Sequence, residues 1–88
     1  MDYNILRKKL LFRSTHRGCK ETDFLLGDFA EAHLETLSNN ELYEYQQILE
    51  LGDIDLYNWI TGKEEIPEDV NSKMLQKIII FNKSRQYG

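Results

Sequence analysis

Apolar residues recur along this chain with the spacing of helices, and glycines interrupt that pattern at short intervals. Within each run the apolar residues fall on one helical face, three or four positions apart. Gly18, Gly52 and Gly62 follow the ends of three runs, where glycine commonly ends a helix. No run shows the alternation of a convincing strand. These features predict an all-α fold, a compact single-domain bundle of about five short helices.

The expected helices are joined by short connections, which favour antiparallel neighbours. Their expected ranges are roughly 3–15, 22 or 23 to 37, 38–51, 53–61 and 67–83. Residues 1–88 are expected to form one domain, with residues 1–3 and 84–88 frayed. The aromatic and aliphatic residues expected in the core include Phe24, Phe29, Leu56 and Trp59.

Several residues predict how these helices begin. Ser38 and Glu41 match a capping box. Pro67 suits the first turn of the last helix, because its missing N–H needs no partner there. Thr22 or Asp23 is expected to cap the second helix. Gly27, inside that helix, is expected to let a neighbouring helix approach closely.

Length and cysteine content exclude several functions. A chain of 88 residues buries only about 60–65% of its unfolded surface, which leaves no room for a deep cofactor cavity beside a substrate site. An autonomous enzyme is therefore not expected. The single cysteine, Cys19, excludes an intrachain disulfide and a cysteine-based zinc cage, and favours a cytoplasmic location. The apolar run 10–12 is too short for membrane insertion.

Charge is distributed unevenly along the chain, although its net value is only −4. Residues 1–20 carry six basic side chains and one acidic one, and residues 70–88 carry four basic and no acidic ones. Residues 21–69 carry fourteen acidic side chains and one basic one. Because the acidic middle would repel phosphates, nucleic-acid binding is not expected. The basic N-terminal segment suits an acidic protein surface or a phosphorylated cofactor.

The segment 17–23 carries more charge than a turn between two helices requires. Gly18 as a helix terminator and Asp23 as a cap would account for a simple turn. Arg17, Lys20 and Glu21 are not needed for that purpose. The segment is therefore either a solvated turn or a surface that a partner recognises.

The same segment resembles a known family. Arg17-Gly18-x-x-Glu21-x-Asp23, followed by an apolar helix, is similar to the Arg-Gly-x-x-Glu signature of the succinate dehydrogenase flavinylation factors, which are the bacterial SdhE proteins and mitochondrial succinate dehydrogenase assembly factor 2. Residues 53–60, Asp-Ile-Asp-Leu-Tyr-Asn-Trp-Ile, resemble a second motif of that family. The resemblance covers about residues 5–82. Thr15 and Thr22 depart from the aromatic and apolar residues usual at their positions.

The resemblance implies a binding protein and not an enzyme. Family members promote covalent FAD attachment to the flavoprotein subunit of succinate dehydrogenase and, in bacteria, of fumarate reductase. FAD would then be the client's cofactor, with none held stably by this chain. The implied interface positions are Arg17, Gly18 and Glu21, followed by Asp23. The small acidic surface favours a monomer.

Two further residues are candidates for the same surface. Arg13 lies one helical turn before Arg17, so that it belongs either to the interface or to a solvated helix face. His16 lies beside the signature. His33 is expected to be a packing residue on the apolar side of its helix. Neither histidine has a convincing metal-ligating partner at i+3 or i+4, so no metal site is expected.

Two other functional classes stay open. Relatives of this family have also been described as antitoxins of toxin–antitoxin pairs, a role that needs only a binding surface. A thiol enzyme would need Arg17 and Lys20 to stabilise the Cys19 thiolate. Only His16 is near enough in sequence to act as its base, so catalysis is not expected.

Overall fold

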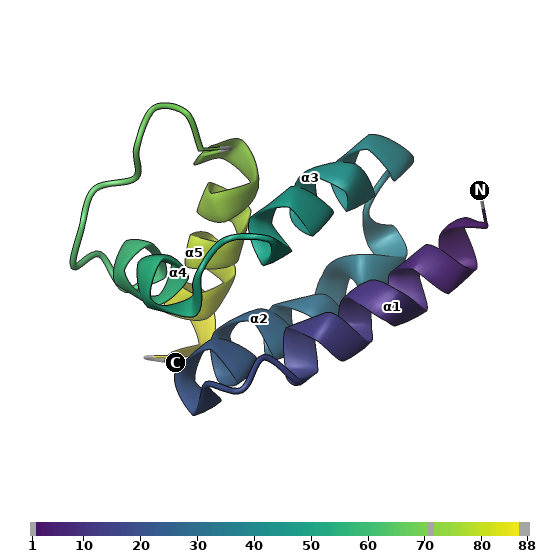
Figure 1. The fold of residues 1–88 in the computed structure, drawn as a ribbon, viewed down its shortest axis with the longest axis horizontal. Helices are drawn as coiled ribbons and strands as arrows, with labels where there is room; N and C mark the ends of the chain where they lie inside the picture. Colours follow the sequence, from purple (N-terminus) through teal and green to yellow (C-terminus); the bar gives the residue numbers. More distant parts are fainter. Residues whose placement is uncertain (1, 71, 87–88) are drawn as a thin grey trace.

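The part of the chain that the structure describes forms five α-helices and one 3₁₀ turn, arranged as Figure 1 shows. The computed structural model describes residues 2–70 and 72–86. In chain order the elements are α1 (Tyr3–Thr15), α2 (Lys20–His33), η1 (Leu34–Thr36), α3 (Asn39–Leu49), α4 (Asp53–Ile60) and α5 (Ser72–Gln86). No strand occurs within the described ranges. The predicted all-α bundle is confirmed.

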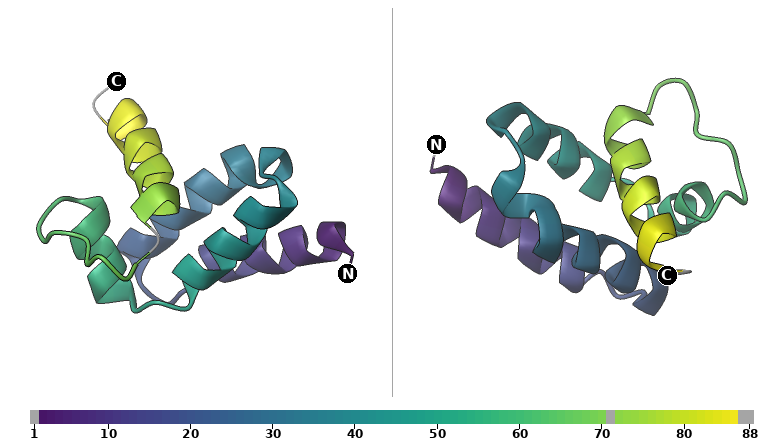
Figure 2. Two further views of the ribbon diagram at one scale, coloured as in Figure 1. Left: turned by 90° about the horizontal axis from the view of Figure 1, so that it is seen from above. Right: turned by 180° about the vertical axis from the view of Figure 1, so that it is seen from behind.

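Helices α1 and α2 lie side by side in opposite directions, and α3 packs on α1 (Figures 1 and 2). The other two helices, α4 and α5, cover α2. A Cβ atom on Gly27 would lie only 3.0 Å from Cγ2 of Thr15. Gly27 therefore allows α1 and α2 to approach closely, as the sequence predicted.

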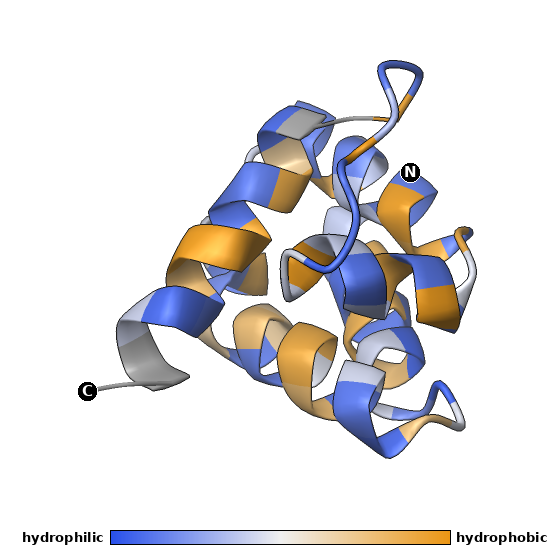
Figure 3. Cartoon of the chain, turned by 90° about the vertical axis from the view of Figure 1, so that its left-hand side faces the viewer, coloured by the Kyte–Doolittle hydropathy of each residue, from blue (hydrophilic) through white to orange (hydrophobic). Residues whose placement is uncertain are grey.

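The core draws side chains from all five helices. Figure 3 shows hydrophobic and hydrophilic residues alternating around the helices, as expected when one side of each is buried. Phe29 and Leu56 are buried, and Trp59 is only 8% exposed. Other large and fully enclosed side chains are Leu10, Leu26, Leu42, Tyr45, Ile48, Met74, Leu75 and Ile78.

Phe24 is not a core residue, contrary to expectation. Its side chain is 55% exposed, whereas Thr22, Leu25 and Leu26 in the same helix are buried. Successive residues of a helix are about 100° apart, so Phe24 projects about 200° away from Thr22. The apolar run 24–26 is wider than the face that α2 buries.

A buried hydrogen-bonded pair links three helices. The hydroxyl groups of Ser14 on α1 and Tyr45 on α3 are 2.6 Å apart. Ser14 donates to the Leu10 carbonyl, and the Tyr45 hydroxyl lies 3.3 Å from the Leu26 carbonyl on α2. Burial raises the pKa of Tyr45 to about 12, so its phenol stays protonated at neutral pH.

Some predicted helix ends are confirmed and others are wrong. Ser38 and Glu41 form the capping box at the start of α3. Gly18 and Gly62 have φ angles of +88° and +81°, in the region that favours glycine. Pro67 does not begin the last helix. Its carbonyl accepts from the Val70 N–H in a turn, and α5 starts only at Ser72.

The ends of the chain are helical where the structure describes them. Asp2 is the N-cap of α1, with its carboxylate accepting from the Asn4 and Ile5 N–H groups at 2.9 and 3.4 Å. Helix α5 extends to Gln86, and residues 1 and 87–88 lie outside the described residues. The expected fraying of residues 1–3 and 84–88 therefore stays a prediction. The expectation that residues 1–88 form one domain also stays a prediction.

Candidate functional site

The candidate site is the turn between α1 and α2, which carries more charge than a turn between two helices requires. Helix α1 ends at Thr15, and α2 begins at Lys20 with Cys19 as its N-cap residue. Gly18 is exposed, and a Cβ atom at this position would meet nothing within 4 Å. Glycine is therefore favoured here by its positive φ angle and not by crowding. The open space above Gly18 would let a partner's backbone approach.

Arg17 points into the protein, not toward solvent. Its side chain is 10% exposed, and Nε donates to Oδ1 of Asp53 at 2.5 Å. Nη1 donates to the Leu49 carbonyl at 3.0 Å, and Nη2 donates to the Leu51 carbonyl at 2.9 Å. These carbonyls lie at the end of α3, where a helix leaves acceptors without intrahelical partners. Arg17 therefore joins the α1–α2 turn to the α3–α4 junction.

This geometry corrects the expectation for Arg17. This cation was expected to be unnecessary for folding, but its intramolecular bonds show that the fold uses it. Gly52 is the N-cap residue of α4, and Asp53 lies in its first turn. There its carboxylate faces both the positive end of α4 and the Arg17 guanidinium.

Asp23 and Thr22 also act within the fold, in ways that differ from the predicted cap. The Asp23 carboxylate accepts from the Arg17 N–H at 2.7 Å, six residues back along the chain. Thr22 is fully buried, and its hydroxyl donates to the Cys19 carbonyl at 3.2 Å. Because α2 already begins at Lys20, neither residue is its N-cap. Asp23 instead fixes the path of the turn.

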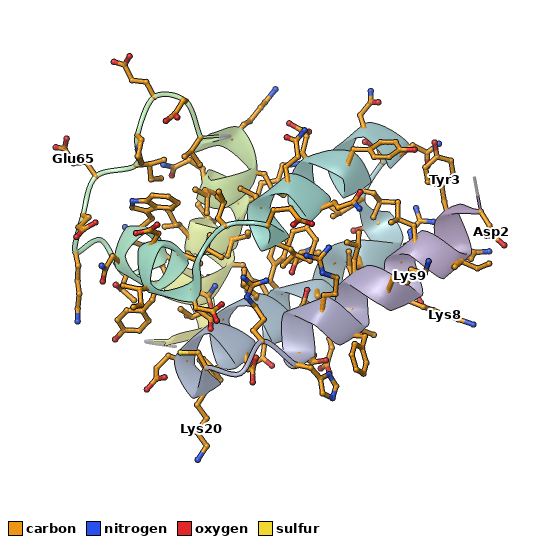
Figure 4. The ribbon with its side chains drawn as sticks, in the orientation of Figure 1. Asp2, Tyr3, Lys8, Lys9, Lys20 and Glu65 are labelled. Carbon is orange, nitrogen blue, oxygen red and sulfur yellow. The ribbon has the colours of Figure 1, made fainter. Side chains whose placement is uncertain are left out.

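Glu21 is the charged residue of the signature that stays on the surface. Its side chain is exposed in the first turn of α2. A hydrogen bond from its own backbone N–H, and a second from the Cys19 thiol at 3.3 Å, lower its pKa. Glu21 is therefore an ionised acceptor near the positive end of a helix. Lys20 beside it extends away from the protein (Figure 4).

Arg13 and His16 lie on the α1 side of the turn. Arg13 forms an ion pair of 3.0 Å with Glu50; the Arg13 side chain is partly exposed and that of Glu50 is largely exposed. The exposed His16 ring stacks on Phe12, with centroids 4.1 Å apart and planes 13° apart. Nδ1 of His16 lies 3.0 Å from the Phe12 carbonyl. The sequence analysis missed Phe12, which is 62% exposed despite its place in an apolar run.

The arrangement offers recognition chemistry and little for catalysis. Cys19 is half-buried, and its thiol donates to Glu21, a contact with an anion that does not favour a thiolate. Among the described residues no group of three His, Cys, Asp or Glu side chains could hold a metal ion. His33 packs between Phe29 and Phe81, with ring centroids 5.0 and 5.2 Å away, as expected of a packing residue.

Comparison with known proteins places the chain in a family. Residues 8–82 match the family described as "Flavinator of succinate dehydrogenase". The chain is 38% identical over 82 residues to "FAD assembly factor SdhE" of Acetobacter pasteurianus. It is 41% identical over 73 residues to "Succinate dehydrogenase assembly factor 2, mitochondrial" of Dictyostelium discoideum, and 41% identical over 78 residues to the protein of the same name from Caenorhabditis elegans.

These alignments cover unequal shares of the proteins. They include 93%, 83% and 85% of this chain, and 75%, 52% and 66% of the respective relatives. The chain thus spans about half the length of the Dictyostelium protein. None of these three relatives is named as an antitoxin, so the antitoxin alternative has no support. No helix among the described residues is long and apolar enough to cross a membrane.

Proposed function

Because the chain belongs to the family of flavinators of succinate dehydrogenase, we propose that it is an assembly factor for that enzyme. In this role it binds the flavoprotein subunit transiently and promotes covalent attachment of FAD to it. The chain itself is not an enzyme. FAD is the cofactor of the client, and this chain holds no cofactor stably.

The division of the α1–α2 turn into inward and outward residues carries the proposal. Arg17 and Asp23 hold the turn to the rest of the fold through bonds of 2.5–3.0 Å. Gly18 and Glu21 are exposed on that fixed support. A rigid backbone that presents one open glycine and one ionised carboxylate loses little freedom on binding, which favours recognition.

The proposed interface therefore centres on Gly18 and Glu21, with His16 and Arg13 at its edge. Arg17 and Asp23 contribute by holding the turn in place. Partner donors would meet the Glu21 carboxylate, and partner backbone would approach Gly18. Fumarate reductase is a second proposed client, since its flavoprotein chemistry is of the same kind.

The fraction of the flavoprotein subunit that carries covalent FAD tests the function. It is measured by flavin fluorescence of the denatured subunit from a deletion strain. We expect little covalent flavin in that strain, and restoration by the wild-type chain. Glu21→Arg should fail to restore it. Glu64→Arg, which reverses an exposed acid far from the turn, should restore it fully.

Normal covalent flavin in the deletion strain would contradict the proposed function. If Glu21→Arg restored covalent flavin as well as the wild-type chain does, only the assignment of Glu21 to the interface would be contradicted. We also propose a monomer that acts in the cytoplasm, because the lone thiol of Cys19 suits a reducing compartment. Light scattering after gel filtration would measure the oligomeric state, and a dimer would overturn that part.

A further inference from the structure

The outer side of α1 carries an aromatic pair that packing within the fold does not explain. Phe12 is 62% exposed, and its ring stacks on the exposed His16. A large apolar side chain left in water forgoes the stabilisation that burial would give it. Aromatic residues beside a candidate interface are common anchors of protein–protein binding. This pair lies within one helical turn of the Gly18 turn.

A surface hollow lies beside this pair, where α1 meets the end of α3. It encloses about 280 Å³ and is lined by Phe12, Arg13, His16, Arg17 and Leu49. That volume accommodates one or two side chains of a partner. Its lining residues are thus a phenylalanine, a histidine, a leucine and two arginines.

One of those guanidinium groups can change its partner at low cost. Arg13 pairs with Glu50 at 3.0 Å, but the two side chains are 39% and 63% exposed. Ion pairs between exposed side chains contribute little to stability. A partner carboxylate that entered the hollow would therefore compete with Glu50 successfully. The Arg17 guanidinium is already paired with Asp53, so Arg13 is the cation of the hollow that can change its partner.

The charge of α1 favours the same kind of partner. Between Tyr3 and Lys20 the chain has six basic residues and no acidic one. Lys8 and Lys20 extend away from the ribbon, whereas Glu65 lies at the opposite end of the molecule (Figure 4). The remainder of the chain is strongly acidic up to residue 69. An acidic partner surface would thus be attracted to α1 and repelled by the far end.

We propose that the hollow beside Phe12 receives an acidic side chain of the flavoprotein subunit, with Arg13 as its counter-ion and the Phe12–His16 pair as an apolar cover. This inference rests on the proposed function and specifies the chemistry of the partner surface. The interface then extends from Gly18 and Glu21 along the outer side of α1. The partner segment carries a carboxylate next to an apolar residue.

Binding of the purified flavoprotein subunit to variants of the full chain tests this inference. Phe12→Ala and Arg13→Glu should each weaken binding at least tenfold, as expected for interface anchors. Ile80→Ala is the matched control, because Ile80 is 65% exposed on α5. It should bind like the wild type. Circular dichroism should show unchanged helix content in all three.

Salt dependence provides a second measurement. Raising sodium chloride from about 0.05 M to about 0.3 M should weaken wild-type binding, and Arg13→Gln should reduce that dependence. If the wild-type chain fails to bind the subunit, the proposed function is wrong and this inference falls with it. If the wild type binds but Phe12→Ala and Arg13→Glu bind equally well, only the inference is overturned. An equal loss in Ile80→Ala would also overturn it.

Discussion

At Arg17 one planar guanidinium meets acceptors from three residues. The fork geometry of arginine matches the Asp53 carboxylate and the carbonyls of Leu49 and Leu51 at 2.5–3.0 Å. Lysine has a single ammonium group and would reach only part of this set. The signature arginine is thus a cross-link between two parts of the chain that are more than thirty residues apart.

Removing this cross-link should destabilise the fold. Arg17→Ala leaves Asp53 without its counter-ion and two carbonyls without donors, and we expect a loss of about 2–4 kcal/mol in the free energy of unfolding. Urea denaturation followed by circular dichroism measures it. Arg13→Ala is the control, because its exposed pair with Glu50 should contribute below about 1 kcal/mol. Equal losses in the two variants would contradict the role assigned to Arg17.

Substitutions of Gly18 can distinguish an effect on folding from an effect on binding. The Cβ atom that Gly18→Arg adds meets nothing within 4 Å, but the residue must adopt a φ of +88°, which costs about 1–2 kcal/mol. The variant should fold and lose binding to the flavoprotein subunit. Gly18→Ala has the same backbone cost with little added bulk, and should retain most of the binding. Normal binding by Gly18→Arg would remove Gly18 from the interface, whereas unfolding would show that its role is mainly structural.

At the scale of elements, the start of α3 combines a local cap with a tertiary contact. The Glu41 carboxylate accepts from the Ser38 N–H within the capping box and also from the Lys77 ammonium of α5. The hydrogen bond from Lys77, followed by that from the Ser38 backbone, lowers the pKa of Glu41 to about 2. The same side chain therefore caps the start of α3 and attaches α5 to it.

The pH dependence of stability should reveal this contact. Because the folded-state pKa is below the usual 4.5, the stabilisation is present above 4.5 and is lost as pH falls toward 2. Glu41→Gln should be less stable than the wild type by about 1 kcal/mol at neutral pH. The difference should shrink in acid. Thermal unfolding at several pH values measures it, and a difference that does not change with pH would contradict the assignment.

At the scale of the whole molecule, a small core makes each large buried side chain important. Trp59 is 8% exposed, and truncating a buried aromatic costs about 3–5 kcal/mol. Domains of this size have little stability in excess of that. Trp59→Ala should therefore unfold much of the population and lower covalent flavin without touching the interface. Ile54→Ala, at a residue 78% exposed on the same helix, should change stability by less than about 0.5 kcal/mol.

The sequence predicted the helices better than it predicted their first residues. The first helix was placed at 3–15, where α1 lies, and the capping box at Ser38 was confirmed. The start of the last helix was wrong, because Pro67 is as suitable for a turn as for a helix. The predicted N-cap residue of α2 was wrong, because the Asp23 carboxylate accepts from the Arg17 N–H across the turn. Local sequence propensity cannot distinguish these alternatives, because the outcome depends on which other parts of the chain pack nearby.

For the candidate site, sequence reasoning identified the location but not the direction of its side chains. Gly18 and Glu21 are exposed as expected, and Arg17 is not. Its partner Asp53 belongs to the second motif that suggested the family. Two motifs that occur together in one family can be in contact in the folded protein. The presence of both motifs was therefore the sequence feature that could have predicted the contacts of Arg17 with Asp23 and Asp53. Nothing in the spacing indicated that Phe12 would be exposed.

The sequence by itself determined the helical class, the glycine-ended turns and the family. These properties depend on local periodicity, on backbone preferences and on short motifs, all of which are written in neighbouring residues. Only the tertiary structure decided that Arg17 and Asp23 support the turn while Gly18 and Glu21 face outward. That division depends on acceptors at Leu49, Leu51 and Asp53. These acceptors lie at the α3–α4 junction, more than thirty residues away along the chain, and only packing brings them to the turn.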